Sequence, residues 1–362
     1  MPNIVICLDG TGNEVKAKAV TNVFKISEVI DLTDPTSQLL YYGPGVGTLP
    51  APGAWTRFAR VISKNIGGLG LGHGMRHDIE QAYTYLMNTW QPGDKVFVFG
   101  FSRGAYTARA LCGMLYRVGL LRPGSDNLVP YAVRVYARHP GRDSNLAAPE
   151  GWDRMDRFAE GLSRRRDGDR LSFPVHFLGL FDTVKGTGII GRDISWPYTN
   201  QLPNVEVVRH AVSIDETRRP FRESLVPVPQ DADAPQVTEA WFAGVHSDVG
   251  GGFADDPELG DISMRWMLDG ATAVGLRVRP QRFRNRYTLN EKDASVPIHR
   301  NGRLWALAGN RRRRIPEGAR IHGSVQTRIA AEDYHPKLPR TYEWEDEQWW
   351  GPTSLPPTHS TR

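Results

Sequence analysis

The sequence predicts an α/β fold, with a doubly wound, mainly parallel sheet and helices on both faces. Short apolar runs, which we interpret as buried strands, alternate along the chain with stretches of helical periodicity. This alternation favours parallel pairing, because a helix between two strands returns the chain to the starting edge of the sheet. Polar residues follow directly on several apolar runs. Such positions indicate a functional site at the carboxyl ends of the strands.

Each expected element follows from the spacing of its apolar residues. Strands are expected at residues 3–8, 39–42, 94–99, 175–181 and 238–243. Helices are expected after Thr21 as an N-cap, along an apolar face from Met75 to Trp90, over 105–115 and over 262–274. The glycine-rich stretch 67–74 contains no nucleotide-binding pattern, and we interpret it as a loop.

Length and composition predict a globular protein that buries a sizeable core, in one large domain or two ordinary ones. The chain has 362 residues, of which 40% are hydrophobic and 23% charged, as in ordinary soluble proteins. We expect the main domain over residues 1–280 and, within it, an irregular, polar, arginine-rich insertion at 122–170 that resembles a lid. Residues 281–362 are expected to form a basic, irregular extension packed on or next to this core.

Charge and hydropathy restrict the expected partners and compartment. The net charge of +5 is spread along the chain, and its densest runs, 164–166 and 311–314, are interpreted as solvated loop faces. No nucleic-acid motif accompanies them, so we expect no nucleic-acid partner, while peripheral contact with an anionic lipid surface stays open. No apolar stretch approaches the ~20 residues that span a bilayer. A cytoplasmic protein without signal peptide or transmembrane segment is expected, with signal-independent export left open. The sequence does not indicate an oligomeric state.

The most informative motif is the run Gly100-Phe101-Ser102-Arg103-Gly104, which joins an apolar strand to a helix-forming stretch. This G-x-S-x-G pattern is typical of a nucleophile elbow, in which a strained strand-to-helix turn presents a serine. Glycines flank the serine because the backbone turns back sharply there. Ser102 is therefore the expected nucleophile, and the alternative is that it only caps the following helix.

A serine nucleophile needs a base, and the base needs an acid that orients it. Asp182 and His246 each follow an apolar strand, and the order Ser102, Asp182, His246 is that of α/β-hydrolases. We therefore expect His246 as the base and Asp182 as the acid. Asp248 and Asp215 are alternative candidates for the acid role.

An oxyanion hole requires two converging backbone amides. The Arg103 N–H is one candidate, and an amide of Gly10 or Thr11, in the turn after the first strand, is the other. The Arg103 side chain is a candidate contact for an anionic substrate. Asp9 is expected to be structural and to hold the first turn through backbone hydrogen bonds.

Two further polar residues are expected to be structural. His210 has no position at the end of an expected strand, so we interpret it as a core histidine. Arg109 lies on the helix after the elbow and is expected to form an ion pair there. Two cysteines show neither a disulfide framework nor a metal-binding spacing.

Together, these motifs resemble a known family, the uncharacterised α/β-hydrolase domain that includes phospholipase effectors of the bacterial type VI secretion system. The resemblance implies an α/β-hydrolase-like fold and places the triad at Ser102, Asp182 and His246. Members usually carry a large membrane-anchoring or accessory region, whereas here residues 281–362 follow the expected core. The similar segments are LDGTGN at 8–13, GFSRGA at 100–105, GLFDTV at 179–184, WFAGVHSDVGGG at 241–252 and, with unclear role, HAVSIDETR at 210–218.

The expected function is that of a serine hydrolase that needs no cofactor and no metal. It would cleave carboxylic esters through an acyl-enzyme, with phospholipids or other acyl lipids as substrates. One alternative is a metal-dependent phosphoesterase with Asp9, Asp182, His246 and Asp248 as ligands. Another is a binding module without catalytic activity on a hydrolase scaffold.

Overall fold

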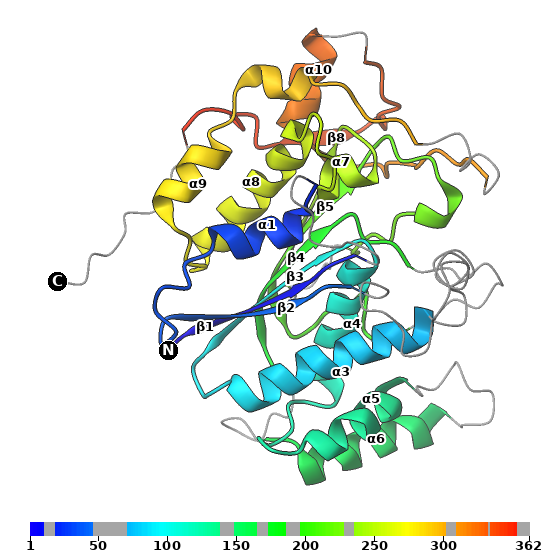
Figure 1. The fold of residues 1–362 in the computed structure, drawn as a ribbon. Coiled ribbons are helices and arrows are strands. Elements are labelled where there is room, and N and C mark those ends of the chain that lie inside the picture. Colours follow the sequence, from blue (N-terminus) through cyan, green and yellow to red (C-terminus); the bar gives the residue numbers. More distant parts are fainter. Residues whose placement is uncertain are drawn as a thin grey trace, which may run out of the picture.

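A single parallel sheet forms the centre of the molecule (Figure 1). The computed structural model describes residues 1–10, 19–45, 71–137, 148–164, 173–185, 196–227, 235–301, 309–331 and 334–352. Within them, the sheet has eight strands in the order β2-β1-β3-β4-β5-β6-β7-β8. Every pairing between these strands is parallel. The predicted α/β class with a doubly wound parallel sheet is confirmed.

The first strands lie close to their predicted positions, whereas three strands were not predicted. The strands are β1 (Asn3–Leu8), β2 (Gln38–Gly43), β3 (Lys95–Phe101), β4 (Val175–Phe181), β5 (Val205–Ser213), β6 (Gln236–Phe242), β7 (Ala319–His322) and β8 (Tyr342–Glu345). Of these, β5, β7 and β8 are absent from the sequence-based prediction. In β5, Arg209 and His210 interrupt the apolar run, but both are paired inside the fold: Arg209 donates to the Trp266 carbonyl and His210 contacts Glu239.

Helices cover both faces of the sheet (Figure 1). They are α1 (Asn22–Val29), α3 (Leu71–Thr89), α4 (Arg103–Arg117), α5 (Val129–Ala137), α6 (Ala148–Leu162), α7 (His246–Gly250), α8 (Glu258–Ala273), α9 (Pro280–Tyr287) and α10 (Gly323–Ala331). Short 3₁₀ turns are η1 (Asp126–Leu128), η2 (Arg219–Phe221) and η3 (Glu291–Ser295). In Figure 1, α3 to α6 lie on one side of the sheet, and α1, α8 and α9 lie on the other.

Alternation along the strands builds the two halves of the core. In β1, Ile4 and Ile6 join the apolar cluster under α3 and α4, whereas Val5 and Cys7 join the cluster under α1 and α8. Successive side chains of a strand point to opposite faces, so a strand that is apolar throughout is buried on both sides. The chain order reverses at β1, which has β2 on one side and β3 on the other. In open parallel sheets, this reversal opens a crevice at the carboxyl ends of the strands.

The helix boundaries include one confirmation and one correction. The Thr21 hydroxyl accepts a hydrogen bond from the Phe24 N–H at 3.1 Å and caps α1 as predicted. Helix α3 already begins at Leu71, inside the glycine-rich stretch that we predicted as a loop. The loop prediction is therefore wrong from Leu71 onward, and residues 67–70 lie outside the described residues.

The stretch 122–170 is not irregular where the structure describes it. It forms α5 and α6, which pack on α3 and α4 through buried residues such as Tyr136 and Phe158. Arg164 was predicted on a solvated loop face, but it donates to the carbonyls of Leu121 at 3.0 Å and Trp90 at 2.9 Å. That prediction is wrong for Arg164, because the guanidinium satisfies carbonyl groups near the end of α3. Residues 138–147 and 165–170 lie outside the described residues.

The C-terminal extension is also regular and continues the sheet. Strand β7 pairs with β6 through Ala240↔Arg320 and Trp241↔Ile321, and β8 pairs with β7. An irregular extension was predicted because β7 and β8 are only four residues long and carry charged residues. Separately, none of the helices in the described ranges has the length and hydropathy that crossing a bilayer requires.

Candidate active site

Ser102 lies in a strained turn between β3 and α4. Its backbone angles are φ 58° and ψ −122°, a region that residues other than glycine rarely adopt. Two backbone hydrogen bonds hold this turn against the end of β4: the Ser102 N–H donates to the Phe181 carbonyl at 3.0 Å, and the Val184 N–H donates to the Ser102 carbonyl at 3.3 Å. The Ser102 hydroxyl does not cap α4. The strained backbone and the absent cap hydrogen bond match the turn expected of a nucleophile elbow and argue against the capping alternative.

The two glycines of the motif are required by close approach of the backbone. A Cβ on Gly104 would lie 2.2 Å from the Leu8 carbonyl oxygen, at the end of β1. A Cβ on Gly100 would lie 2.6 Å from the Ala105 Cα. Neither neighbour is a flexible side chain, so no other residue fits without a backbone shift. The elbow therefore sits tightly against the end of β1, at the reversal of strand order.

Asp182 and His246 form a hydrogen-bonded pair beside this elbow. The His246 Nδ1 lies 2.5 Å from the Asp182 Oδ2, and both residues are buried. The imidazole ring lies between Phe101 and Phe221, with ring centroids 4.6 Å and 4.9 Å away. Phe101 directly precedes Ser102, which places the imidazole next to the elbow.

The Ser102 hydroxyl and His246 are not hydrogen-bonded to each other among the contacts of the described residues. In free enzymes the bond between nucleophile and base is often long and tightens when substrate binds. The Asp182 contact engages Nδ1, which leaves Nε2 as the ring nitrogen that can accept a proton. The arrangement thus provides an acid–base pair whose free nitrogen can serve the neighbouring hydroxyl.

The glycine run after β6 makes room for this packing. A Cβ on Gly250 would lie 1.9 Å from an atom of the Phe101 ring. Only glycine at this position therefore leaves room for the Phe101 ring to pack against His246. The motif that contains both His246 and Gly250 thus meets two needs: His246 supplies the imidazole, and Gly250 leaves space for the Phe101 ring.

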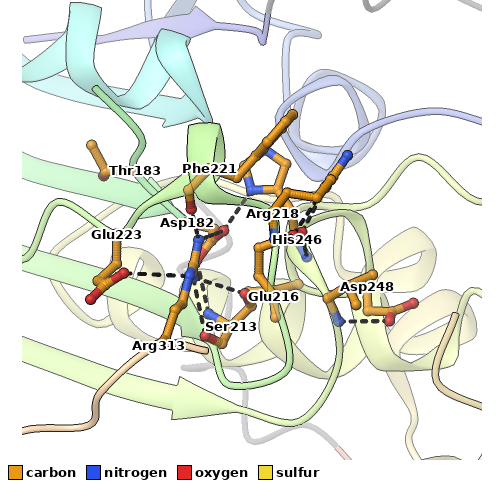
Figure 2. Close-up of polar contacts among 12 residues, drawn as sticks. Asp182, Thr183, Ser213, Glu216, Arg218, Phe221, Glu223, His246, Asp248 and Arg313 are labelled. Atoms are coloured by element: carbon orange, nitrogen blue, oxygen red, sulfur yellow. Dashed lines mark hydrogen bonds and ion pairs between the residues drawn. The ribbon is translucent and has the colours of Figure 1, made fainter. Parts of the chain in front are cut away.

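Asp182 has a second charged partner that sequence reasoning did not identify (Figure 2). The Arg313 guanidinium forms a bidentate ion pair with the carboxylate: Nη1 donates to Oδ1, and Nη2 donates to Oδ2 at 2.9 Å. The Ser213 N–H, at the end of β5, donates to the same Oδ1 at 2.9 Å. The prediction that the run 311–314 is a solvated face is wrong for Arg313, whose side chain is only 2% exposed.

These contacts set the protonation states of the pair. Burial alone would raise the pKa of the Asp182 carboxyl, but Arg313 and the His246 hydrogen bond outweigh it and hold the pKa well below its usual value. Burial lowers the pKa of His246, Asp182 opposes this shift, and the positive charges of Arg313 and Arg218 add to it. Asp182 is therefore ionised and His246 neutral near pH 7, the states that a triad needs before reaction.

A second carboxylate holds the main chain of His246. The Glu216 Oε2 accepts the His246 N–H at 3.2 Å, and its Oε1 accepts the Asn301 amide at 3.0 Å. Arg218 binds both oxygens of Glu216, at 2.9 Å and 2.7 Å. Both Glu216 and Arg218 belong to the segment 210–218, whose role the sequence left unclear. That segment comprises the end of β5 and the loop after it, which supports the acid–base pair.

The alternative acids lie elsewhere. Asp248 accepts from the Val245 N–H at 2.8 Å and contacts the His299 Nδ1 at 2.6 Å. Asp215 accepts from the Gly244 N–H at 2.7 Å and from the Tyr334 hydroxyl at 2.9 Å. Of the three aspartates considered, the structure brings only Asp182 to the imidazole of His246.

The backbone amides predicted as oxyanion donors differ in their hydrogen bonding in the structure. Arg103 is the first residue of α4, so its N–H belongs to the orphan amides at a helix N-terminus. The Gly10 N–H instead donates to the Asp9 Oδ1 at 2.6 Å. That amide is already engaged and is a poor candidate, while Thr11 lies outside the described residues. Asp9 also accepts from the Thr21 and Tyr42 hydroxyls, which matches its predicted structural role.

Two further predictions concern polar residues in the interior. The His210 Nε2 accepts the Thr183 N–H at 3.1 Å, and its Nδ1 lies 2.8 Å from Glu239, so the predicted structural role is confirmed. Arg109 is fully buried and donates to the carbonyls of Thr199 and Ser224. The predicted ion pair is wrong, because this guanidinium binds only neutral oxygens among the described residues.

The proposed metal ligands do not converge where they are described. Asp9 binds Thr21, Asp248 binds His299, and both Asp182 oxygens are engaged by Arg313. In the described ranges, no three histidine, cysteine or acidic side chains are grouped as a metal site requires. A guanidinium occupies the position on Asp182 that a cation would need.

Comparison with known proteins identifies the family. Residues 2–270 match the model of the family described as T6SS, phospholipase effector Tle1-like, catalytic domain. The chain belongs to this family. Its resemblance to type VI phospholipase effectors, first indicated by the motifs, is thereby confirmed.

The individual proteins that this chain resembles either share little sequence identity with it or match it over only part of their own length. The uncharacterized protein YEL023C of Saccharomyces cerevisiae is 34% identical over 224 residues, which are 61% of this chain and 32% of that protein. The chain thus spans about a third of that relative's length. A crystal structure of an uncharacterized protein from Pseudomonas aeruginosa is 18% identical with a TM-score of 0.46, over 81% of this chain and 50% of that one.

The structure of the Tle1 effector bound to the VgrG spike from the type 6 secretion system is 16% identical with a TM-score of 0.41. It covers 96% of this chain and 82% of that one. At TM-scores below 0.5, neither structural likeness carries an argument about this chain. The family membership rests on the matched residues 2–270 alone.

Proposed function

We propose that this chain is a serine hydrolase that cleaves a carboxylic ester of a phospholipid or a related acyl lipid. Ser102 is the nucleophile, His246 the general base and then acid, and Asp182 the residue that orients and charge-balances the imidazole. The lipid class is suggested by membership in the phospholipase effector family. The reaction type is supported by the arrangement of the three side chains.

The observation that carries the proposal is the Asp182–His246 hydrogen bond of 2.5 Å next to a strained Ser102 turn. Each feature alone has structural explanations, such as a buried ion pair or a tight turn. A strained serine between a strand and a helix, beside an imidazole whose Nδ1 is fixed by an ionised carboxylate, matches the requirements of nucleophilic catalysis. The strain is paid for by the surrounding fold, and such strain clusters at functional sites.

The mechanism follows from this geometry. His246 Nε2 takes the proton of the Ser102 hydroxyl while Oγ attacks the acyl carbonyl carbon. Asp182 stabilises the imidazolium, which then gives its proton to the leaving alcohol as the acyl-enzyme forms. Water attacks the acyl-enzyme with His246 again as base, and the fatty acid leaves. Ser102 is restored with its proton.

The charge that develops on the carbonyl oxygen needs donors near the elbow. The N-terminus of α4 supplies the Arg103 N–H, and the positive end of the helix dipole points the same way. Loss of one such donor typically costs about 3 kcal/mol of barrier height. Burial lowers the pKa of the Arg103 side chain to about 10, a value at which this side chain stays cationic at pH 7. Its charge beside Ser102 suits a substrate with a phosphate group.

The test compares Ser102→Ala with the wild-type protein and with Ser125→Ala. Ser125 precedes η1 and makes no capping hydrogen bond, so its variant controls for the loss of any serine hydroxyl. Each protein is assayed on short acyl esters, on phospholipid micelles of graded chain length and with a fluorophosphonate probe. Wild type and Ser125→Ala should turn over ester and react with the probe. Ser102→Ala should do neither, and full activity of this variant would refute the mechanism.

A further inference from the structure

Arg313 is the structural feature that the proposed triad does not yet explain. It follows the matched residues 2–270 by more than forty positions and comes from the strand-bearing C-terminal extension. We propose that Arg313 is a positioning residue of the active site, which fixes the Asp182 carboxylate against His246 and keeps the imidazole in its neutral, proton-accepting form. This inference rests on the proposed triad and extends it to a part of the chain outside the matched family model.

The contacts of Arg313 fix the plane of the Asp182 carboxylate. Two donors meet two oxygens, so the guanidinium and the carboxylate are held side by side in one orientation. Nη1 also donates to the Ser213 carbonyl at 3.0 Å and hydroxyl at 2.8 Å, and Nη2 donates to the Phe221 carbonyl at 2.6 Å. Arg313 is thus anchored on both sides of Asp182 (Figure 2).

Ser213 and Phe221, which accept these hydrogen bonds, belong to the segments that lie next to Asp182 and His246. Ser213 ends β5, next to the strand that carries Asp182, and Phe221 packs its ring on His246. The Arg313 Nε lies 3.8 Å from Glu223, too far for a hydrogen bond. The same guanidinium thus contacts the acid, the end of β5 and the main chain of Phe221, whose ring packs against His246.

Stability alone does not account for such a residue. Burying two charges costs desolvation energy, and apolar replacement of a buried ion pair is often neutral or stabilising. A neutral donor can also orient the Asp182 carboxylate, as the Ser213 N–H already does. Orientation alone therefore does not require a charged partner. A full positive charge on the acid of a triad has an additional effect, because it competes with the imidazolium for the same carboxylate.

The groups that face His246 determine the direction of this effect. Asp182 favours the charged imidazole, whereas Arg313 and Arg218 disfavour it. Glu216 accepts the His246 main-chain N–H, and its own charge is balanced by Arg218. Asp248, on the same helix as His246, turns to His299. Arg313 is therefore the positive charge that is balanced mainly through Asp182, and removing it should raise the pKa of the imidazole.

The experiment uses the full chain with Arg313→Met, Arg313→Lys and, as the matched control, Arg312→Met. Arg312 belongs to the same arginine run but is exposed, so its variant removes a charge without touching the site. Lysine keeps the charge but cannot form the two-pronged contact. The kinetic parameters of a soluble short acyl ester are measured across pH, and thermal melting reports the folded fraction.

Arg313→Met should lower kcat by about 10- to 100-fold, by analogy with the loss of a hydrogen-bonding partner that orients a metal-binding side chain, and KM should change little. Its acidic limb of kcat/KM should move to higher pH. Arg313→Lys should lower kcat but leave the limb near its wild-type position. Arg312→Met should match the wild type in both respects. A folded Arg313→Met with wild-type kcat and limb would overturn the proposal.

A second readout does not depend on finding a substrate. The protonation of His246 is followed by NMR of the imidazole, assigned by comparison with His246→Asn. Arg313→Met, or Arg313→Lys if the methionine variant does not fold, is titrated beside the wild type. In Arg313→Met, a higher imidazole pKa supports the proposal. In Arg313→Lys, a changed NMR signal of the His246 Nδ1 proton, which lies in the hydrogen bond to Asp182, supports it. Unchanged imidazole resonances and pKa in the folded variant overturn it, whether or not ester hydrolysis is found.

Discussion

Ser102 is held by the backbone, whereas Asp182 and His246 are held by side chains. At the elbow, two backbone hydrogen bonds to the end of β4 and two close glycine contacts fix the serine, and the partners in all four contacts are main-chain atoms. The acid–base pair instead depends on Glu216 and on Arg313, which lies 131 residues beyond Asp182. The two halves of one site are thus held by different kinds of contact, main-chain contacts at the serine and mainly side-chain contacts at the acid–base pair.

This difference has a consequence for how each half fails. A local turn is lost when its own residues no longer fit, and the damage is to the fold around it. A network of side chains can lose one member while the backbone stays in place. The loss is then expected in catalytic activity more than in the stability of the fold. The following predictions separate these two kinds of failure, beginning with the largest expected effect.

Asp182→Asn should break the side-chain half while leaving the elbow intact. An amide favours the wrong imidazole tautomer, and the expected loss in kcat is about 10⁴-fold, equivalent to about 5 kcal/mol of barrier. Arg313 would also lose its carboxylate, so the melting temperature should fall. The measurement is kcat per folded molecule, with Asp153→Asn, at an exposed position of α6, as the control. Activity within tenfold of wild type would remove Asp182 from the mechanism.

Gly104→Ala should break the backbone half. In a helix this exchange normally stabilises by up to about 1 kcal/mol, but here the new Cβ would lie 2.2 Å from the Leu8 carbonyl oxygen. We expect a net loss of about 1–3 kcal/mol in the free energy of unfolding, as for other overpacked sites. Gly161→Ala, in α6, is the control because a Cβ there meets nothing within 4 Å. Chemical denaturation of both variants gives the comparison, and equal stabilisation would contradict the described elbow.

The pH profile of the wild type should show the smallest effect. Only neutral His246 accepts a proton, so kcat/KM should rise with pH through the imidazole pKa. Burial, with Arg313 and Arg218, lowers that pKa from 6.5. The acidic limb should therefore have its midpoint below pH 6.5, and activity should persist where an exposed histidine is already charged. A midpoint above 6.5 would show that Asp182 outweighs burial and the two arginines.

The features that could be predicted from sequence are those that a pattern of neighbouring residues indicates. The strands β1 and β4, the Thr21 cap and the strand-to-helix turn at Ser102 each show such a pattern, and the structure has them where the patterns placed them. The order of Ser102, Asp182 and His246 also predicted which aspartate meets the imidazole of His246, because strand ends of a parallel sheet converge. Family membership then agreed with the motifs over residues 2–270.

The features that were missed depend on partners far along the chain. Arg313 resembles its exposed neighbours in sequence, and only the fold places it on Asp182. Strand β5 carries Arg209 and His210, whose partners lie in later elements, so its pattern did not predict a strand. The insertion at 122–170 was rich in arginine, yet Arg164 ends on buried carbonyls. Buried charged residues cannot be separated from surface ones until their partners are known.

The separation of 131 residues between Asp182 and Arg313 also imposes an order of events during synthesis. Chains are extended at about 5–20 residues per second, so Arg313 follows Asp182 into existence by roughly 7 to 26 seconds. Throughout that interval the nascent chain already carries the elbow serine and, later, the histidine, but not the guanidinium. The guanidinium thus completes the acid–base network after its acid and its base have been synthesised, while β7, α10 and β8 are still to come.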